Sequence, residues 1–94
     1  MNYINAYAHI SSATTTQVFT GACSLVAIIV NATSAGTITI VDNTTGTTPV
    51  VGVLKASIAE GTYNYGAPAG ITLSTGLRVI TGGASDITVV YRVQ

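Results

Sequence analysis

Apolar and polar residues alternate along several short segments of this 94-residue chain, with the period of two that is typical of a β-strand. The clearest case is the last segment, whose first face carries the apolar residues Ile87, Val89, Tyr91 and Val93. The second face carries Asp86, Thr88, Val90 and Arg92. This alternation predicts a strand with one face on a core, and Val90 indicates that the second face is partly covered too.

The same pattern predicts short strands along the whole chain, separated by residues that favour turns. The expected strands are Tyr3–His9, Thr15–Thr20, Leu25–Asn31, Gly36–Val41, Val50–Lys55, Thr62–Tyr65, Leu77–Thr81 and Ile87–Val93. The only plausible helical segment is Ala56–Glu60, which Gly61 would end within one turn. About eight short strands predict an all-β chain, a single antiparallel, jelly-roll-like β-sandwich domain over residues 1–94.

The segment Leu25–Val30 is apolar on both faces, which predicts a central strand whose second face is covered. Another subunit is one possible cover. We therefore expect contacts between subunits at Tyr3, Tyr7, Leu25, Ile28 and Val30.

Composition supports the all-β prediction and excludes several functions. Thr, Val and Ile, the β-branched residues that favour strands, make up 37 of the 94 residues. Only six residues are charged and the formal net charge is zero, so the chain lacks the Lys/Arg patch that nucleic-acid binding needs. The most apolar run falls far short of the roughly 20 residues that span a membrane, and the N-terminus does not resemble a signal peptide. We expect a soluble protein made without export.

Residues for catalysis or metal binding are scarce. His9 is the only histidine, and no Gly-x-Ser-x-Gly elbow presents a serine to it. Cys23 is the only cysteine, and its apolar neighbours predict a buried thiol. Asp42 and Asp86 are expected beside loops, where aspartate stabilises turns. We predict no enzymatic activity, no catalytic residue, no metal and no cofactor.

The tyrosines leave one binding alternative open. Tyr63 and Tyr65 share a face of one short strand beside the loop Gly66–Gly70, where their rings could stack on a sugar. Packing at a sheet rim or at a subunit contact is the favoured interpretation of the same residues.

The low charge itself favours association. A lone domain of this size usually carries charge on its surface for solubility, whereas this one offers Thr, Ser, Asn and Gly with 48% apolar residues. Neutral subunits can also sit close together in many copies without repelling one another. We expect a homo-oligomer.

The C-terminal stretch 76–92, with Gly82-Gly83 in a hairpin and the strand Asp86-Ile87-Thr88-Val89-Val90-Tyr91, resembles the end of many small virion proteins of tailed bacteriophages. Residues 25–41 and 61–77 are similar to their earlier strands, so that the resemblance covers about Thr14 to Arg92. It implies a jelly-roll-like sandwich and a role on the virion, as a capsid decoration (cement), head-fibre, head–tail accessory or tail-tip protein. It carries over no functional residue.

The sequence thus leads to one expected function and one alternative. The expected function is a decoration protein on the outer capsid surface, a trimer that bridges capsomers and binds the major capsid protein, made in the host cytoplasm. The alternative is a receptor- or carbohydrate-binding or accessory module of a head fibre, connector or tail tip, which would bind a glycan through Tyr63 and Tyr65.

Overall fold

The structure is a computed structural model that describes residues 5–32, 36–65 and 70–93. Within these ranges the chain forms nine strands and no helix. The strands are β1 (Asn5–Ile10), β2 (Thr15–Thr20), β3 (Cys23–Ala32), β4 (Ile38–Asp42), β5 (Val50–Leu54), β6 (Gly61–Asn64), β7 (Ile71–Leu73), β8 (Gly76–Thr81) and β9 (Asp86–Val93). The predicted β-sandwich is confirmed, and each of the eight predicted strands corresponds to an observed one.

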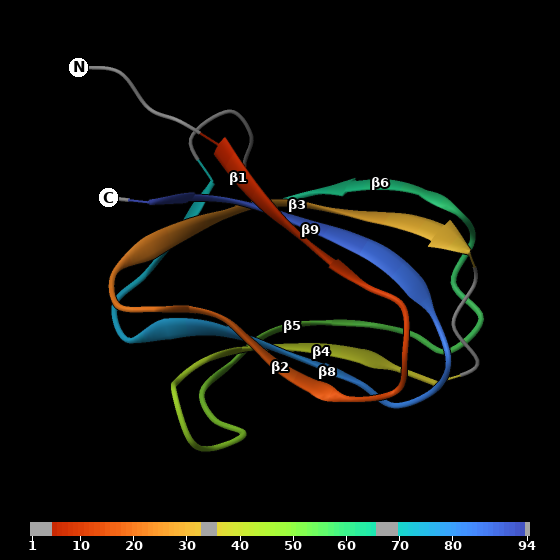
Figure 1. Cartoon of the computed structure of the whole chain (residues 1–94), viewed down its shortest axis with the longest axis horizontal. Coiled ribbons are helices and arrows are strands. Elements are labelled where there is room, and N and C mark those ends of the chain that lie inside the picture. Colours follow the sequence, from red (N-terminus) through yellow and green to blue (C-terminus); the bar gives the residue numbers. More distant parts are fainter. Residues whose placement is uncertain (1–4, 33–35, 66–69, 94) are drawn as a thin grey trace.

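The strands form two stacked sheets (Figure 1). One sheet has the order β1-β9-β3-β6, with β7 also paired to β3, and the other has the order β2-β8-β4-β5. Apart from the short β7, the chain pairs its first strand with its last, its second with its second-last, β3 with β6 and β4 with β5. Successive pairs belong to alternate sheets. This is a long hairpin rolled up into a jelly roll.

The core lies between the two sheets, where the alternation of each strand places its apolar face. In β9, Ile87 and Val89 are fully buried, as the period of two predicts. The opposite sheet supplies Ile38 and Ile40 from β4. The remaining buried members of the core cluster are Ile10, Cys23, Leu25, Ile28, Val30, Leu54, Leu73, Leu77 and Val79.

Strand β3 occupies the central position that its doubly apolar pattern predicts, with β9 on one side and β6 and β7 on the other. A register shift between Leu25 and Ala27 breaks its alternation, so that Cys23 and Leu25 before the shift and Ile28 after it all belong to the core cluster.

Two details of the sequence prediction need correction. Ala56–Glu60 forms no helix but a turn, in which Ile58 N–H donates to Lys55 O and Ser57 adopts a φ of 60°, a left-handed conformation that ends any right-handed helix. The three-residue strand β7 was not expected, because so short a run shows no period before Ser74.

Candidate functional site

The outer face of the larger sheet carries the most exposed apolar ring in the described residues. Because Ile87 and Val89 point into the core, Thr88 and Val90 of β9 point outward. Residues directly opposite one another share a face, so the partners of these two extend the surface across β1 and β3. We call this the outer face of the sheet; it comprises Tyr7, His9, Ala27, Ile29, Thr88 and Val90, of which Ala27 is buried. Tyr7 is 73% exposed.

A group of polar side chains from three adjacent strands lies at one end of the outer face. Asp86 Oδ1 accepts hydrogen bonds from His9 Nε2 and, at 3.1 Å, from Asn31 Nδ2. Asn31 Nδ2 also donates to Thr88 Oγ1 at 3.1 Å. We call these four residues the polar cluster. The hydrogen bonds from His9 and Asn31, with the charge interaction with His9, hold the pKa of Asp86 below its ordinary value.

The polar cluster is a set of exposed hydrogen-bonding groups. His9 and Asp86 are both well exposed, at 52% and 41% of their side-chain surface. Among the described residues the hydrogen bond of His9 goes to the carboxylate, and the Thr88 hydroxyl accepts from Asn31.

The residues predicted at a subunit contact do not lie together. Tyr3 lies outside the described residues. Tyr7 is on the outer face, whereas Leu25, Ile28 and Val30 are between 0% and 2% exposed and belong to the core of their own chain. This corrects the expectation for these three residues. The opposite sheet covers their apolar side chains, so a second subunit is not needed as the cover.

Tyr63 and Tyr65 share a side, as the alternation predicts, but that side is the inner one. Both rings are partly buried and pack against the core. The Tyr63 hydroxyl donates to Ala59 O, and the Tyr65 ring lies where a side chain at Gly52 would be, 3.2 Å from the position of a Cβ. Burial raises the pKa of Tyr65. Neither ring is fully exposed.

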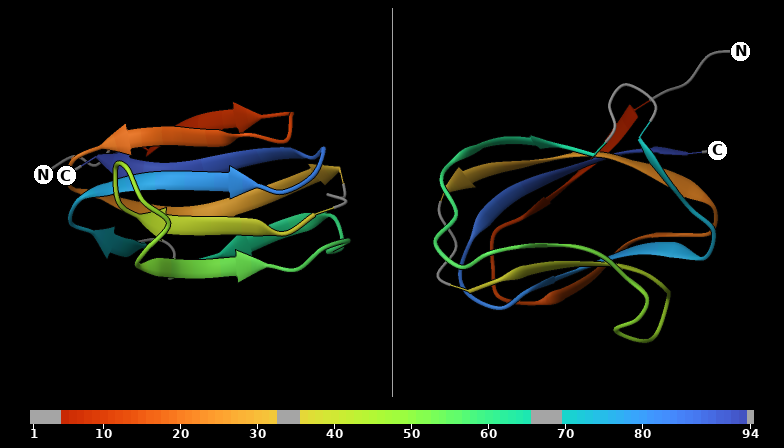
Figure 2. Two further views of the ribbon diagram at one scale, coloured as in Figure 1. Left: turned by 90° about the horizontal axis from the view of Figure 1, so that it is seen from below. Right: turned by 180° about the vertical axis from the view of Figure 1, so that it is seen from behind.

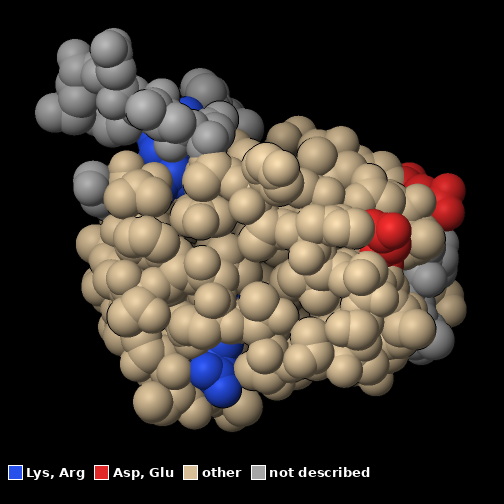
Figure 3. Space-filling view, viewed as in Figure 1, with Lys and Arg blue, Asp and Glu red and all other residues tan. Residues whose placement is uncertain are grey.

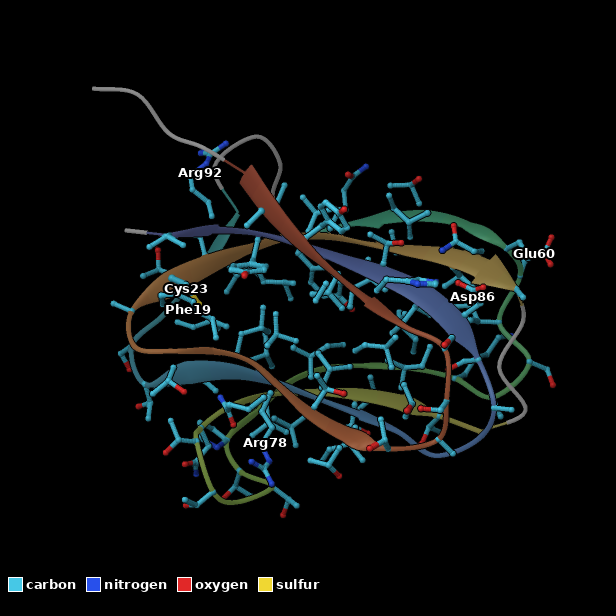
Figure 4. All side chains as sticks on the ribbon, viewed as in Figure 1. Phe19, Cys23, Glu60, Arg78, Asp86 and Arg92 are labelled. Atoms are coloured by element: carbon cyan, nitrogen blue, oxygen red, sulfur yellow. The ribbon has the colours of Figure 1, made fainter. Side chains whose placement is uncertain are left out.

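Charged side chains are sparse. In Figure 4, Glu60 and Asp86 lie at one end of the sandwich and Arg92 at the other. Arg78 projects from β8 away from the core, and its Nη1 donates to Gln17 Oε1 at 3.0 Å and to Thr44 O at 2.9 Å. The face in Figure 3 is otherwise almost wholly uncharged.

The described residues contain no group of three or more His, Cys, Asp or Glu side chains placed to hold a metal ion. The described residues also contain no helix long and apolar enough to cross a membrane.

The chain was compared with protein-family models, curated proteins and solved structures, and none of the three comparisons found a match.

Sequence reasoning named Tyr7 as a candidate contact residue but missed the polar cluster. The alternation within β1 and β9 places Tyr7 with His9 and Asp86 with Thr88, but it does not tell which strands are neighbours. Because β1 and β9 lie at opposite ends of the chain, the register between them depends on the fold of the whole chain and not on the local sequence. Asn31 joins the group only through the register of β3 with β9.

Cys23 gives a direct test of the core. Burial, and to a lesser extent the negative charge of Asp42, raises the pKa of its thiol. We expect Ellman's reagent to leave the native thiol unmodified and to titrate it fully in denaturant. In a Val53→Cys variant, one new thiol on a 56% exposed position should react at once. Equal rates for the native and the introduced thiol would contradict the buried position.

Asp42 stabilises the turn between β7 and β8. Its carboxylate accepts from the backbone N–H groups of Ser74, Thr75 and Gly76 at 2.9 to 3.1 Å. Burial alone raises the pKa of Asp42, but these hydrogen bonds and one from the Ser74 hydroxyl outweigh it and lower the pKa.

Because the folded-state pKa of Asp42 is lowered, its stabilisation is complete above the ordinary value of 3.8 and is lost as the pH falls through the folded-state pKa. We expect Asp42→Asn to lower the free energy of unfolding near neutral pH by about 1.5–3 kcal/mol and to flatten its acid dependence in urea titrations. Glu60→Gln, in an exposed turn, should change the neutral value by less than about 0.5 kcal/mol. Equal losses from both variants would refute the role of Asp42.

Proposed function

We propose that this chain is a structural protein of a bacteriophage virion, a decoration protein that binds the outer capsid surface and stabilises it by bridging capsomers. It associates with itself and with the major capsid protein. It acts by burying apolar and hydroxyl-rich surface across subunit boundaries, a mechanism that needs neither catalysis nor a cofactor.

The observation that carries this proposal is the combination of an almost uncharged surface with exposed apolar residues at two opposite edges of the sandwich. Tyr7 lies on β1, while Val50 and Val53, 49% and 56% exposed, lie on β5. Figure 2 places β1 and β5 at opposite sides of the two layers. Exposed apolar surface is typical of contact sites, and a bridging protein needs two that are well separated.

The fold is compatible with this function without deciding it. Jelly rolls build viral capsid proteins and also lectins, so the architecture alone selects neither. The low charge favours a place among many identical neighbours, where charged subunits would repel one another at short range. The resemblance of residues 14–92 to small virion proteins of tailed phages supports the same assignment.

The alternative, a glycan-binding module that uses Tyr63 and Tyr65, receives less support. Both rings pack against the core, and the Tyr63 hydroxyl already donates to the backbone. A glycan array provides its test, and we expect no binding.

Capsid binding tests the main proposal. Purified protein is mixed with empty expanded capsids of the phage that encodes it, and the capsids are pelleted. We expect saturable binding and capsids that withstand heating better than undecorated ones. Val53→Lys should weaken this binding if the β5 edge faces the capsid, whereas Thr62→Lys, on an exposed position of β6, serves as the matched control. Absence of wild-type binding would refute the proposal.

A further inference from the structure

Strand β1 forms an edge of the larger sheet. Its six residues pair with β9 from Asn5 opposite Arg92 to Ile10 opposite Ile87, without a register shift. No other described strand pairs with β1, so its second row of backbone N–H and C=O groups faces outward. Such a row can bond to another extended strand.

The other edges carry features that hinder strand addition. Edge strand β2 has a register shift between Gln17 and Phe19. Edge strand β5 follows Pro49, and its pairing with β4 also shifts. The remaining edge consists of the short strands β6 and β7, with four and three residues. Among the described edges, β1 alone is both regular and six residues long, and it contains no proline and no Lys, Arg, Asp or Glu.

We propose that β1 pairs antiparallel with β1 of a second copy of this chain, which joins the two larger sheets into one continuous sheet across a two-fold axis. Such an axis, perpendicular to the sheet, keeps each outer face on the same side. Residues opposite each other must then share a face. Every register centred on a residue satisfies this condition, and the two that pair most of β1 are centred on Tyr7 and on Ala8.

The side chains of β1 suit either register. Centred on Tyr7, the two Tyr7 rings lie side by side; centred on Ala8, each Tyr7 lies opposite His9 of the other copy, and aromatic neighbours of this kind stabilise strand pairs. Both registers cover part of Tyr7, the most exposed large apolar residue described. Neither register brings two like formal charges together, since β1 contains no Lys, Arg, Asp or Glu. The inward residues Ala6 and Ala8 are small and leave room for the second strand.

This inference deepens the proposed self-association and names its surface. It gives a two-fold dimer in place of the trimer expected from the sequence, and it leaves the β5 edge of each copy free for the capsid. The dimer test needs no capsid, so the two proposals can fail separately. A monomer that still decorates capsids would overturn the dimer alone, and a dimer that binds no capsid would overturn the proposed function alone.

Disulfide trapping tests the pairing directly. Opposite residues of antiparallel strands lie about 4.5–5.5 Å apart at Cα, within the range of about 4.4–6.8 Å that a disulfide spans. We expect mild oxidation to cross-link either Tyr7→Cys or Ala8→Cys into a dimer, whichever lies on the axis. Val53→Cys, at a 56% exposed position on β5, should stay monomeric in a non-reducing gel. The native Cys23 is fully buried and does not compete.

Sedimentation provides the second readout. The wild-type chain should sediment as a dimer, and Tyr7→Lys should raise the dissociation constant by about tenfold or more, because the new lysines of the two copies lie close together at the join. Val53→Lys, with the same change in charge, should leave the constant unchanged. Circular dichroism confirms that each variant is folded. A wild-type monomer at high concentration with no cross-link at position 7 or 8, or a trimer, would overturn the inference.

Discussion

Leu25→Ala should lower the free energy of unfolding by about 2–5 kcal/mol. Leu25 is fully buried in β3, in the core between the two sheets. Removing its branched end leaves a cavity that a close-packed interior fills only partly. Since a domain of this size is stable by roughly 5–15 kcal/mol, the loss should appear as a clear shift of the urea midpoint.

The same experiment separates a core residue from a subunit contact. If Leu25 acts within its own chain, the loss is independent of protein concentration; if it served an interface, the loss would grow as the protein associates. Val53→Ala, at a 56% exposed position, should cost less than about 0.5 kcal/mol. A Leu25→Ala chain as stable as wild type when dilute would contradict the core assignment.

Gly70→Ala should be destabilising for two independent reasons. Gly70 has a φ of 85°, which costs a residue with a side chain about 1–3 kcal/mol. A Cβ at this position would also lie 2.6 Å from Leu25 O, a backbone atom in the middle of the sheet that cannot move aside. We expect the steric overlap to add about 1–3 kcal/mol to the conformational cost.

Gly61 offers a matched control, because it shares the unusual backbone without the crowding. Its φ is 150°, and a Cβ there would meet no atom within 4 Å. Gly61→Ala should therefore show the conformational cost alone. Equal losses of unfolding free energy for the two variants in urea titrations would contradict the close approach of Gly70 to β3.

The strands could be predicted from the sequence because the period of two is a local property. β2 was expected with its observed ends, and β9 within one residue. The jelly roll was predicted from strand number and length, but the order within each sheet is a non-local property that alternation does not encode. The short β7 and the turn at Ser57 lie below the length at which a period is visible.

The candidate contact residues show the limit of the same reasoning. A strand that is apolar on both faces must be covered on both, but the pattern does not say whether its own chain or a partner supplies the cover. In β3 a register shift allows Cys23, Leu25 and Ile28 all to pack in the chain's own core. Of the described residues predicted at a subunit contact, Tyr7 is the exposed one.

We propose that this sparsely charged jelly roll is a coat component of a phage particle. Quantitative mass spectrometry of purified virions of the phage that encodes the chain tests this claim most directly. We expect a copy number comparable to that of the major capsid protein, on the scale of the capsomer lattice. Absence from the particles, or only the few copies that a tail tip or connector holds, would contradict it.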